Sequence, residues 1–184
     1  MLYLKRSVDA RKKPKITVIL TVAVAVSNEE KILRRAVKDA DIQSDVPYYY
    51  RIPKCTVPVS QANRPVIVGF GPAGMFAALV LAKAGLRPIV LERGKCVEQR
   101  QEDVANFRKT GVLCTESNVQ FGEGGAGTFS DGKLTTGIKD PRIRFVLQSF
   151  VECGAPEEIL YLAKPHIGTD KLVHVVREIG RAHV

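Results

Sequence analysis

The stretch PVIVGFGPAGMFAALVLAKAGLRPIVLE, residues 65–92, constrains the fold more than any other part of the chain. A short β-branched strand runs into the turn GFGPAG, the turn opens a helix of small and apolar residues, and a second apolar strand follows. This order predicts a β–α–β unit that begins a Rossmann-type α/β domain. The start of such a helix offers unpaired N–H groups and a partial positive charge to an anion.

Three glycines and one acidic residue in this stretch have the spacing of a dinucleotide site. Gly69 permits the tight turn, Gly71 lets the backbone approach a pyrophosphate, and Gly74 lets helix and strand pack closely. Glu92 ends the second strand, where a carboxylate can accept hydrogen bonds from ribose hydroxyls. It disfavours a 2′-phosphate, although the neighbouring Arg93 could partly compensate. FAD and NAD share the ADP moiety, so this motif leaves both cofactors open.

A second glycine-rich segment, SNVQFGEGGAGTFSDGKLTTG, occupies residues 117–137. Glycines at this density let backbone N–H groups converge on an anion or a flat ring, and Thr128, Ser130 and Lys133 add donors. The alternative interpretation is a mobile surface loop. A plain NAD domain would be expected to continue with further regular β–α units, which this segment does not do.

Residues 66–94 and 117–134 together resemble a bacterial family of FAD-dependent dehydrogenases in the glutathione-reductase-like two-dinucleotide-binding superfamily. The opening LKRSVDARKK, with the strand after it, resembles the small N-terminal domain of that family. The resemblance implies a flavin oxidoreductase with FAD as cofactor and an unknown small-molecule substrate or electron acceptor; it assigns no catalytic residue. The residues that it implies at FAD are Gly69, Gly71, Pro72, Ala73, Gly74, Glu92 and Arg93, and, toward the pyrophosphate, ribityl chain or flavin ring, Gly125, Thr128, Ser130, Asp131, Gly132, Lys133 and Leu134.

Residues 1–60 have the pattern of a small basic α+β domain with a proline-rich linker. A strand is expected over 16–26 and a helix over 29–40, capped by Ser27 or Asn28. The apolar face of that helix would consist of Ile32, Leu33, Ala36 and Val37. Four prolines between residues 46 and 65 exclude a helix there. The Rossmann-type domain would cover 61–178, with further helices over 97–110, over 141–152 and from Thr169 or Asp170.

The net charge of +9 belongs mainly to residues 1–60, which hold 12 Lys and Arg against 6 Asp and Glu. The cluster RKKPK at 11–15 could bind nucleic acid or another polyanion, an alternative function for this domain. We favour a solvated surface, because no RNA-binding signature accompanies the tyrosines at 48–50. Those tyrosines are expected to pack between the two domains.

The cysteines and histidines predict no metal site. Cys55, Cys96, Cys114 and Cys153 have neither zinc-site nor disulfide-framework spacing, and His166, His174 and His183 have no ligands at suitable positions. The apolar run at 16–26 is too short to span a membrane, and the N-terminus lacks a signal-peptide pattern. We therefore expect a cytoplasmic protein with reduced thiols.

The chain closes on EIGRAHV, and its last six residues match the translation of a widely used sequencing adapter. We expect residues 179–184 to be an adapter artefact and the natural protein to continue with the substrate-facing part. On this hypothesis the fragment is inactive, binds FAD weakly or not at all, and leaves an apolar sheet edge exposed. A genuine coding sequence without the adapter would contradict it.

Overall fold

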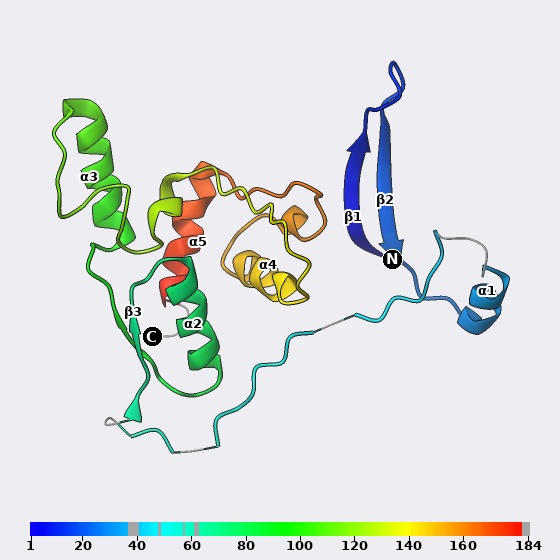
Figure 1. Cartoon of the computed structure of the whole chain (residues 1–184), viewed down its shortest axis with the longest axis horizontal. Coiled ribbons are helices and arrows are strands. Elements are labelled where there is room, and N and C mark those ends of the chain that lie inside the picture. The colour runs from blue at the N-terminus through cyan, green and yellow to red at the C-terminus, as the bar shows by residue number, and fades with distance from the viewer. Residues whose placement is uncertain (37–40, 48, 57, 61–62, 182–184) are drawn as a thin grey trace.

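The computed structural model describes residues 1–36, 41–47, 49–56, 58–60 and 63–181. It is a mixed α/β structure with two small sheets (Figure 1). In chain order the elements are β1 (Leu2–Asp9), β2 (Thr17–Ala23), α1 (Glu29–Arg35), β3 (Val66–Val68), α2 (Pro72–Lys83), β4 (Ile89–Leu91), α3 (Val97–Thr110), the 3₁₀-helix η2 (Ala126–Phe129), α4 (Ile143–Glu152), the 3₁₀-helix η3 (Glu157–Leu160) and α5 (Thr169–Arg181).

The predicted β–α–β unit is confirmed. Strand β3 pairs in parallel with β4, Ile67 opposite Val90, and α2 connects the two strands. The helices expected over 97–110 and from Thr169 are also confirmed, whereas the helix expected from residue 141 begins at Ile143. Within the described residues this sheet has two strands, and Val66, Val68 and Leu91 expose apolar side chains. The exposed apolar surface of this sheet therefore lies on these side chains, and an exposed sheet edge stays a prediction.

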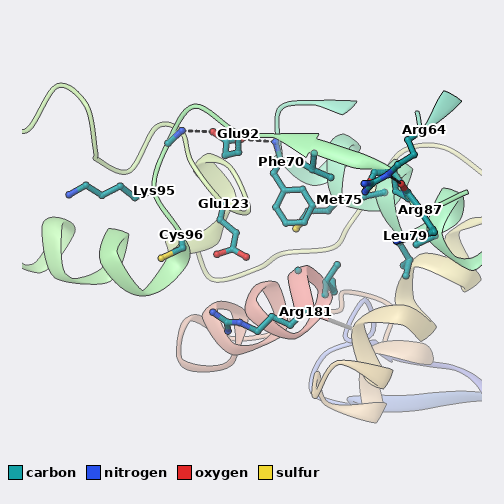
Figure 2. Close-up of a pocket in the computed structure, with 17 residues that line it drawn as sticks. Arg64, Phe70, Met75, Leu79, Arg87, Glu92, Lys95, Cys96, Glu123 and Arg181 are labelled. Atoms are coloured by element: carbon teal, nitrogen blue, oxygen red, sulfur yellow. Dashed lines mark hydrogen bonds between the residues drawn. The ribbon is translucent and has the colours of Figure 1, made fainter. Parts of the chain in front are cut away.

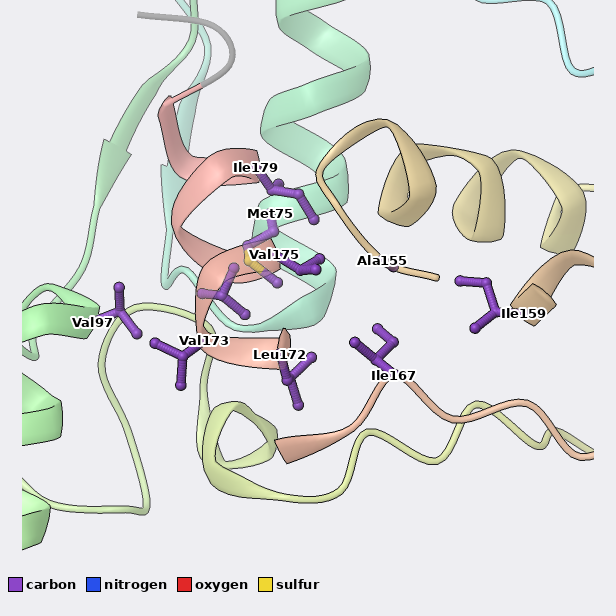
Figure 3. Packing of buried hydrophobic residues seen from close by; sticks show 10 residues of the cluster. Met75, Val97, Ala155, Ile159, Ile167, Leu172, Val173, Val175 and Ile179 are labelled. Atoms are coloured by element: carbon purple, nitrogen blue, oxygen red, sulfur yellow. The ribbon is translucent and has the colours of Figure 1, made fainter. Parts of the chain in front are cut away.

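The hydrophobic core is built around α5 (Figure 3). Apolar residues recur along one face of this helix because its sequence has helical spacing. They pack against side chains from α2, the start of α3 and the segments after α4. The buried cluster is Met75, Val97, Ala155, Ile159, Ile167, Leu172, Val173, Val175, Val176 and Ile179. Ile179 belongs to the stretch expected to be an adapter artefact; residues 182–184 lie outside the described residues, and the origin of that stretch stays a prediction.

The N-terminal sixty residues contain an antiparallel hairpin, β1–β2, and the short helix α1. None of their described residues is fully buried. The helix expected over 29–40 is shorter in the described part: α1 ends at Arg35, and the Asn28 side chain makes no capping hydrogen bond. Of its expected apolar face, Ile32 is exposed, and Leu33 and Ala36 are half-buried. A seven-residue helix with no fully buried side chain has little to stabilise it. Val37 lies outside the described residues.

The hairpin and the linker contact the second part of the chain at separate places. The Arg6 N–H donates to the Tyr161 carbonyl at 2.7 Å, and the Ala163 N–H donates to the Arg6 carbonyl at 2.9 Å. No α-helix or strand occurs in the described residues of 46–60, as the prolines predict. Tyr50 packs on Phe145 of α4 with ring centres 5.2 Å apart, which confirms interdomain packing for this tyrosine. Tyr49 is exposed, and Tyr48 lies outside the described residues.

Among the helices that the structure describes, none is long and apolar enough to cross a membrane. The residues that the structure describes contain no cluster of His, Cys, Asp or Glu side chains that could hold a metal ion. All four cysteines are described, and none forms a disulfide. Cytoplasmic location stays a prediction.

Candidate functional site

The first glycine turn has the close packing that its spacing predicts. Gly69 has a φ of +92°, a conformation that favours glycine, and its N–H donates to the Leu91 carbonyl at 2.7 Å. A Cβ on Gly74 would lie 2.0 Å from the Gly69 carbonyl oxygen, so α2 crosses the turn in backbone contact. The helix begins at Pro72, a residue that suits a first helical turn. The predicted roles of Gly69 and Gly74 are thus confirmed.

Glu92 joins the ends of the two parallel strands. Its Oε2 accepts the Phe70 N–H at 2.6 Å and its Oε1 accepts the Gly94 N–H at 2.8 Å (Figure 2). A carboxylate oxygen has two acceptor lone pairs, so each oxygen keeps one acceptor position for a further donor. Ribose binding by Glu92 is compatible with this geometry and stays a prediction. Arg93 is exposed, 3.4 Å from Glu116, with its guanidinium over the Phe121 ring.

Replacing Glu92 by Ala is expected to lower the free energy of unfolding by about 2 to 4 kcal/mol. The change leaves two half-buried N–H groups without their acceptor, and each such loss costs about 1–3 kcal/mol. Urea unfolding followed by circular dichroism measures the difference. Glu116→Ala is the control, because this exposed carboxylate forms a surface pair with Arg93 and such pairs contribute about 0–1 kcal/mol. Equal losses in the two variants would contradict the arrangement.

The second glycine segment lies directly against the first turn. The Gly124 N–H donates to the Phe70 carbonyl at 2.8 Å, and a Cβ on Gly125 would lie 3.2 Å from the Gly71 Cα. At the end of β4, a Cβ on Gly94 would lie 2.4 Å from the Gly122 Cα. Backbone therefore meets backbone at both strand ends. The two glycine motifs, about fifty residues apart in the sequence, form one continuous surface.

Glu123 connects this segment to the start of α3. Its Oε2 accepts the Val97 N–H at 2.7 Å, and its own N–H donates to the Lys95 carbonyl at 3.1 Å. The carboxylate thus caps a helix whose N-cap residue, Cys96, supplies no side-chain cap, and a negative charge is favourable there. This role of Glu123 was not predicted. The only signal was an acidic side chain inside a run of glycines.

Arg100 belongs to α3, and its side chain lies at the centre of the second glycine segment. This role was also not predicted. Arg100 is 0% exposed, and its guanidinium donates to backbone carbonyls of that segment. Burial lowers the pKa of Arg100 from its ordinary value, while the charges of Glu92 and Glu123 oppose that change. A signal was present: Val97, Arg100 and Val104 are spaced to share one helical face, so Arg100 is the charged residue on an apolar stripe.

The remaining predicted residues of the second motif lie in two groups. Thr128 was expected to offer a donor to the ligand, but it is 1% exposed and its Oγ1 lies 3.0 Å from the Gly125 carbonyl, within the loop. Its hydroxyl points into the loop because buried carbonyls there require hydrogen-bond donors. The Ser130 hydroxyl likewise donates to the Gly127 carbonyl at 2.7 Å. Asp131 and Lys133 are exposed and 3.1 Å apart, and the hydrogen bond from Lys133 lowers the pKa of Asp131.

Gly132 and Leu134 pair through their backbones with the segment before α5. The Ile167 N–H donates to the Gly132 carbonyl at 3.1 Å, and the Leu134 N–H donates to the Pro165 carbonyl at 2.9 Å. Leu134 also packs against the core cluster. Contact of residues 130–134 with a flavin stays a prediction.

A cleft of about 710 Å³ opens beside the strand ends, between α2, β4 and the end of α5 (Figure 2). Most of its wall is apolar, and α2 contributes Met75 and Leu79 to it. Of the residues predicted at the cofactor, Glu92 alone lines it. Ligands of open α/β sheets bind beyond the carboxyl ends of the strands, which here means the end at Phe70, Glu92 and Gly94. We therefore place the candidate site at that end of the cleft and not along its whole length.

No protein-family model matches the sequence. A protein of Clostridium beijerinckii, described as "Uncharacterized protein", is 52% identical to this chain over 177 residues. The alignment covers 96% of this chain and 33% of that protein, so the chain spans a third of the length of the relative that it matches. This similarity brings no activity, cofactor or partner with it.

Proposed function

We propose that this chain provides the FAD-binding part of a flavin-dependent oxidoreductase. The observation that carries the proposal is the contact between the two glycine motifs, with the Gly124 N–H bonded to the Phe70 carbonyl and Gly125 against Gly71. A motif that holds only ADP needs no second glycine loop on its turn. Supporting it are the carboxylate of Glu92 at the end of β4 and the helix start at Pro72.

The residues present fit such a cofactor. The start of α2 would hold the pyrophosphate, because first-turn N–H groups lack intrahelical acceptors. Glu92 would orient the adenosine ribose through its remaining acceptor positions, and the loop around Gly125 would continue along the molecule beyond ADP. When bound, the isoalloxazine of FAD supplies hydride or electron transfer, while the protein binds and orients it.

FAD is expected to bind the purified chain with a dissociation constant below about 1 mM, that is, with more than about 4 kcal/mol of binding free energy. Isothermal titration calorimetry with FAD, NAD and ADP measures it. Binding of FAD in preference to NAD supports the proposal. Preference for NAD would support an NAD-binding domain without flavin instead, and a folded chain that binds none of FAD, NAD and ADP would refute the dinucleotide site. Nucleic-acid binding by the exposed basic residues 11–15 stays the alternative, and a solvated surface stays the favoured interpretation.

Replacing Gly71 by Val is expected to weaken FAD binding by at least about tenfold, or about 1.4 kcal/mol. A Cβ here would already be 4.0 Å from the Gly125 Cα, so the valine methyl groups would enter the space between the two motifs. The same titration on Gly137→Val is the control, since a Cβ on Gly137 meets nothing within 4 Å. Unchanged FAD affinity in Gly71→Val would place the cofactor elsewhere.

A further inference from the structure

The Arg100 side chain leaves α3 and enters the middle of the second glycine segment, which wraps around it. Its Nη2 donates to the carbonyls of Asn118 at 3.3 Å, Val119 at 3.1 Å and Gly125 at 3.1 Å. Its Nη1 donates to the Glu123 carbonyl and lies 3.4 Å from Thr128 Oγ1. One guanidinium therefore gathers carbonyls from residues 118 to 125.

The arrangement requires the shape of arginine as well as its charge. Two terminal nitrogens in one plane serve acceptors on different parts of the loop, and the guanidinium carbon lies 5.0 Å from the centre of the Phe129 ring. The single ammonium of a lysine cannot span these acceptors or stack on the ring in the same way. Arg100 Nε is buried and has no hydrogen-bond partner within the described part of the chain, so the terminal nitrogens alone fix the group.

The loop approaches this side chain as closely as it approaches the first glycine turn. A Cβ on Gly122 would lie 2.5 Å from Arg100 Cδ, and two residues later the Gly124 N–H bonds to the Phe70 carbonyl. Gly125 then offers its carbonyl to Arg100 and its Cα to Gly71. Gly125 thus contacts both the guanidinium and the first motif, and Glu123, whose carbonyl also binds Arg100, directly precedes Gly124.

We propose that Arg100 is the positioning residue of the cofactor site: it holds the second glycine loop in the shape needed to bind FAD beyond its ADP half. This inference rests on the proposed function. Arg100 is completely buried and acts through the loop, without contact to the cofactor.

The test compares FAD and ADP binding in Arg100→Lys. The affinity for ADP depends on the first glycine motif and Glu92, whereas the affinity for FAD depends on both glycine motifs. We expect Arg100→Lys to lose at least about tenfold in FAD affinity and less than about twofold in ADP affinity, with the bound-flavin absorption spectrum shifted toward that of free FAD. Arg108→Lys, an exposed arginine on the same helix, should change neither affinity. Equal losses for FAD and ADP would overturn the proposal, because they would indicate a general structural role.

Amide hydrogen exchange without ligand separates this inference from the proposed function. Arg100→Lys should accelerate exchange at the Glu123, Gly124 and Gly125 N–H groups, which are hydrogen-bonded in the structure, and leave α5 unchanged. If the unmodified chain binds ADP but not FAD, the proposed function fails, and exchange alone decides whether Arg100 positions the loop. Unchanged exchange would overturn that role. Should Arg100→Lys fail to fold, Gly122→Ala disturbs the same contact while keeping the charge, and is measured in its place.

Discussion

Replacing Gly74 by Ala should lower the free energy of unfolding by about 3 kcal/mol, the upper end of the usual cost of overpacking. The new Cβ would lie 2.0 Å from the Gly69 carbonyl oxygen and 3.0 Å from its carbonyl carbon. Both atoms belong to the backbone of a tight turn, so they cannot swing aside as a side chain would. Helix propensity alone predicts the opposite sign, because Ala stabilises a helix interior by about 1 kcal/mol relative to Gly.

Urea unfolding of Gly74→Ala beside Gly137→Ala decides between these two effects. A Cβ on Gly137 meets nothing within 4 Å, and that residue has no positive φ. Surface substitutions of this kind change stability by at most about 0.5 kcal/mol. A Gly74→Ala chain as stable as the parent would mean that α2 does not cross the turn at Gly69.

The elements predicted correctly are those whose pattern is local. Helices α3 and α5 each carry their signal within about fifteen consecutive residues, and the glycine turn with its two strands carries it within one uninterrupted stretch of the chain. Strand β1 was not predicted, because LYLKRSVD gains its partner only when β2 folds back on it. Helix α1 was predicted too long, and none of its side chains is fully buried in the described residues.

Of the candidate site, the backbone of the first glycine turn and the carboxylate at the end of β4 could be predicted from the sequence. The spacing of Gly69, Gly74 and Glu92 implies their positions directly. The interior of the second loop was not predictable, because Arg100 reaches carbonyls that lie 18 to 25 residues further along the chain. For the same reason Thr128, predicted to face the ligand, faces inward toward those carbonyls.

Replacing Gly124 by Ala is the corresponding change in the second loop, with an expected loss of about 3 kcal/mol in the free energy of unfolding. Gly124 has a φ of +82°, which costs a residue with a side chain about 1–2 kcal/mol. The added Cβ would also lie 2.2 Å from Thr128 Oγ1 and 2.6 Å from Val176 Cγ1. Relieving these contacts must move either the hydroxyl beside Arg100 or the core face of α5.

Gly127→Ala is the matched control three residues away, because a Cβ there meets nothing within 4 Å and the residue has no positive φ. Both variants are compared by urea unfolding and by FAD titration. Gly124→Ala should lose stability and FAD affinity together, since the loop that contacts Gly71 is the loop that packs on α5. If both variants retain the stability of the parent, the second glycine segment is a surface loop that does not pack on the core.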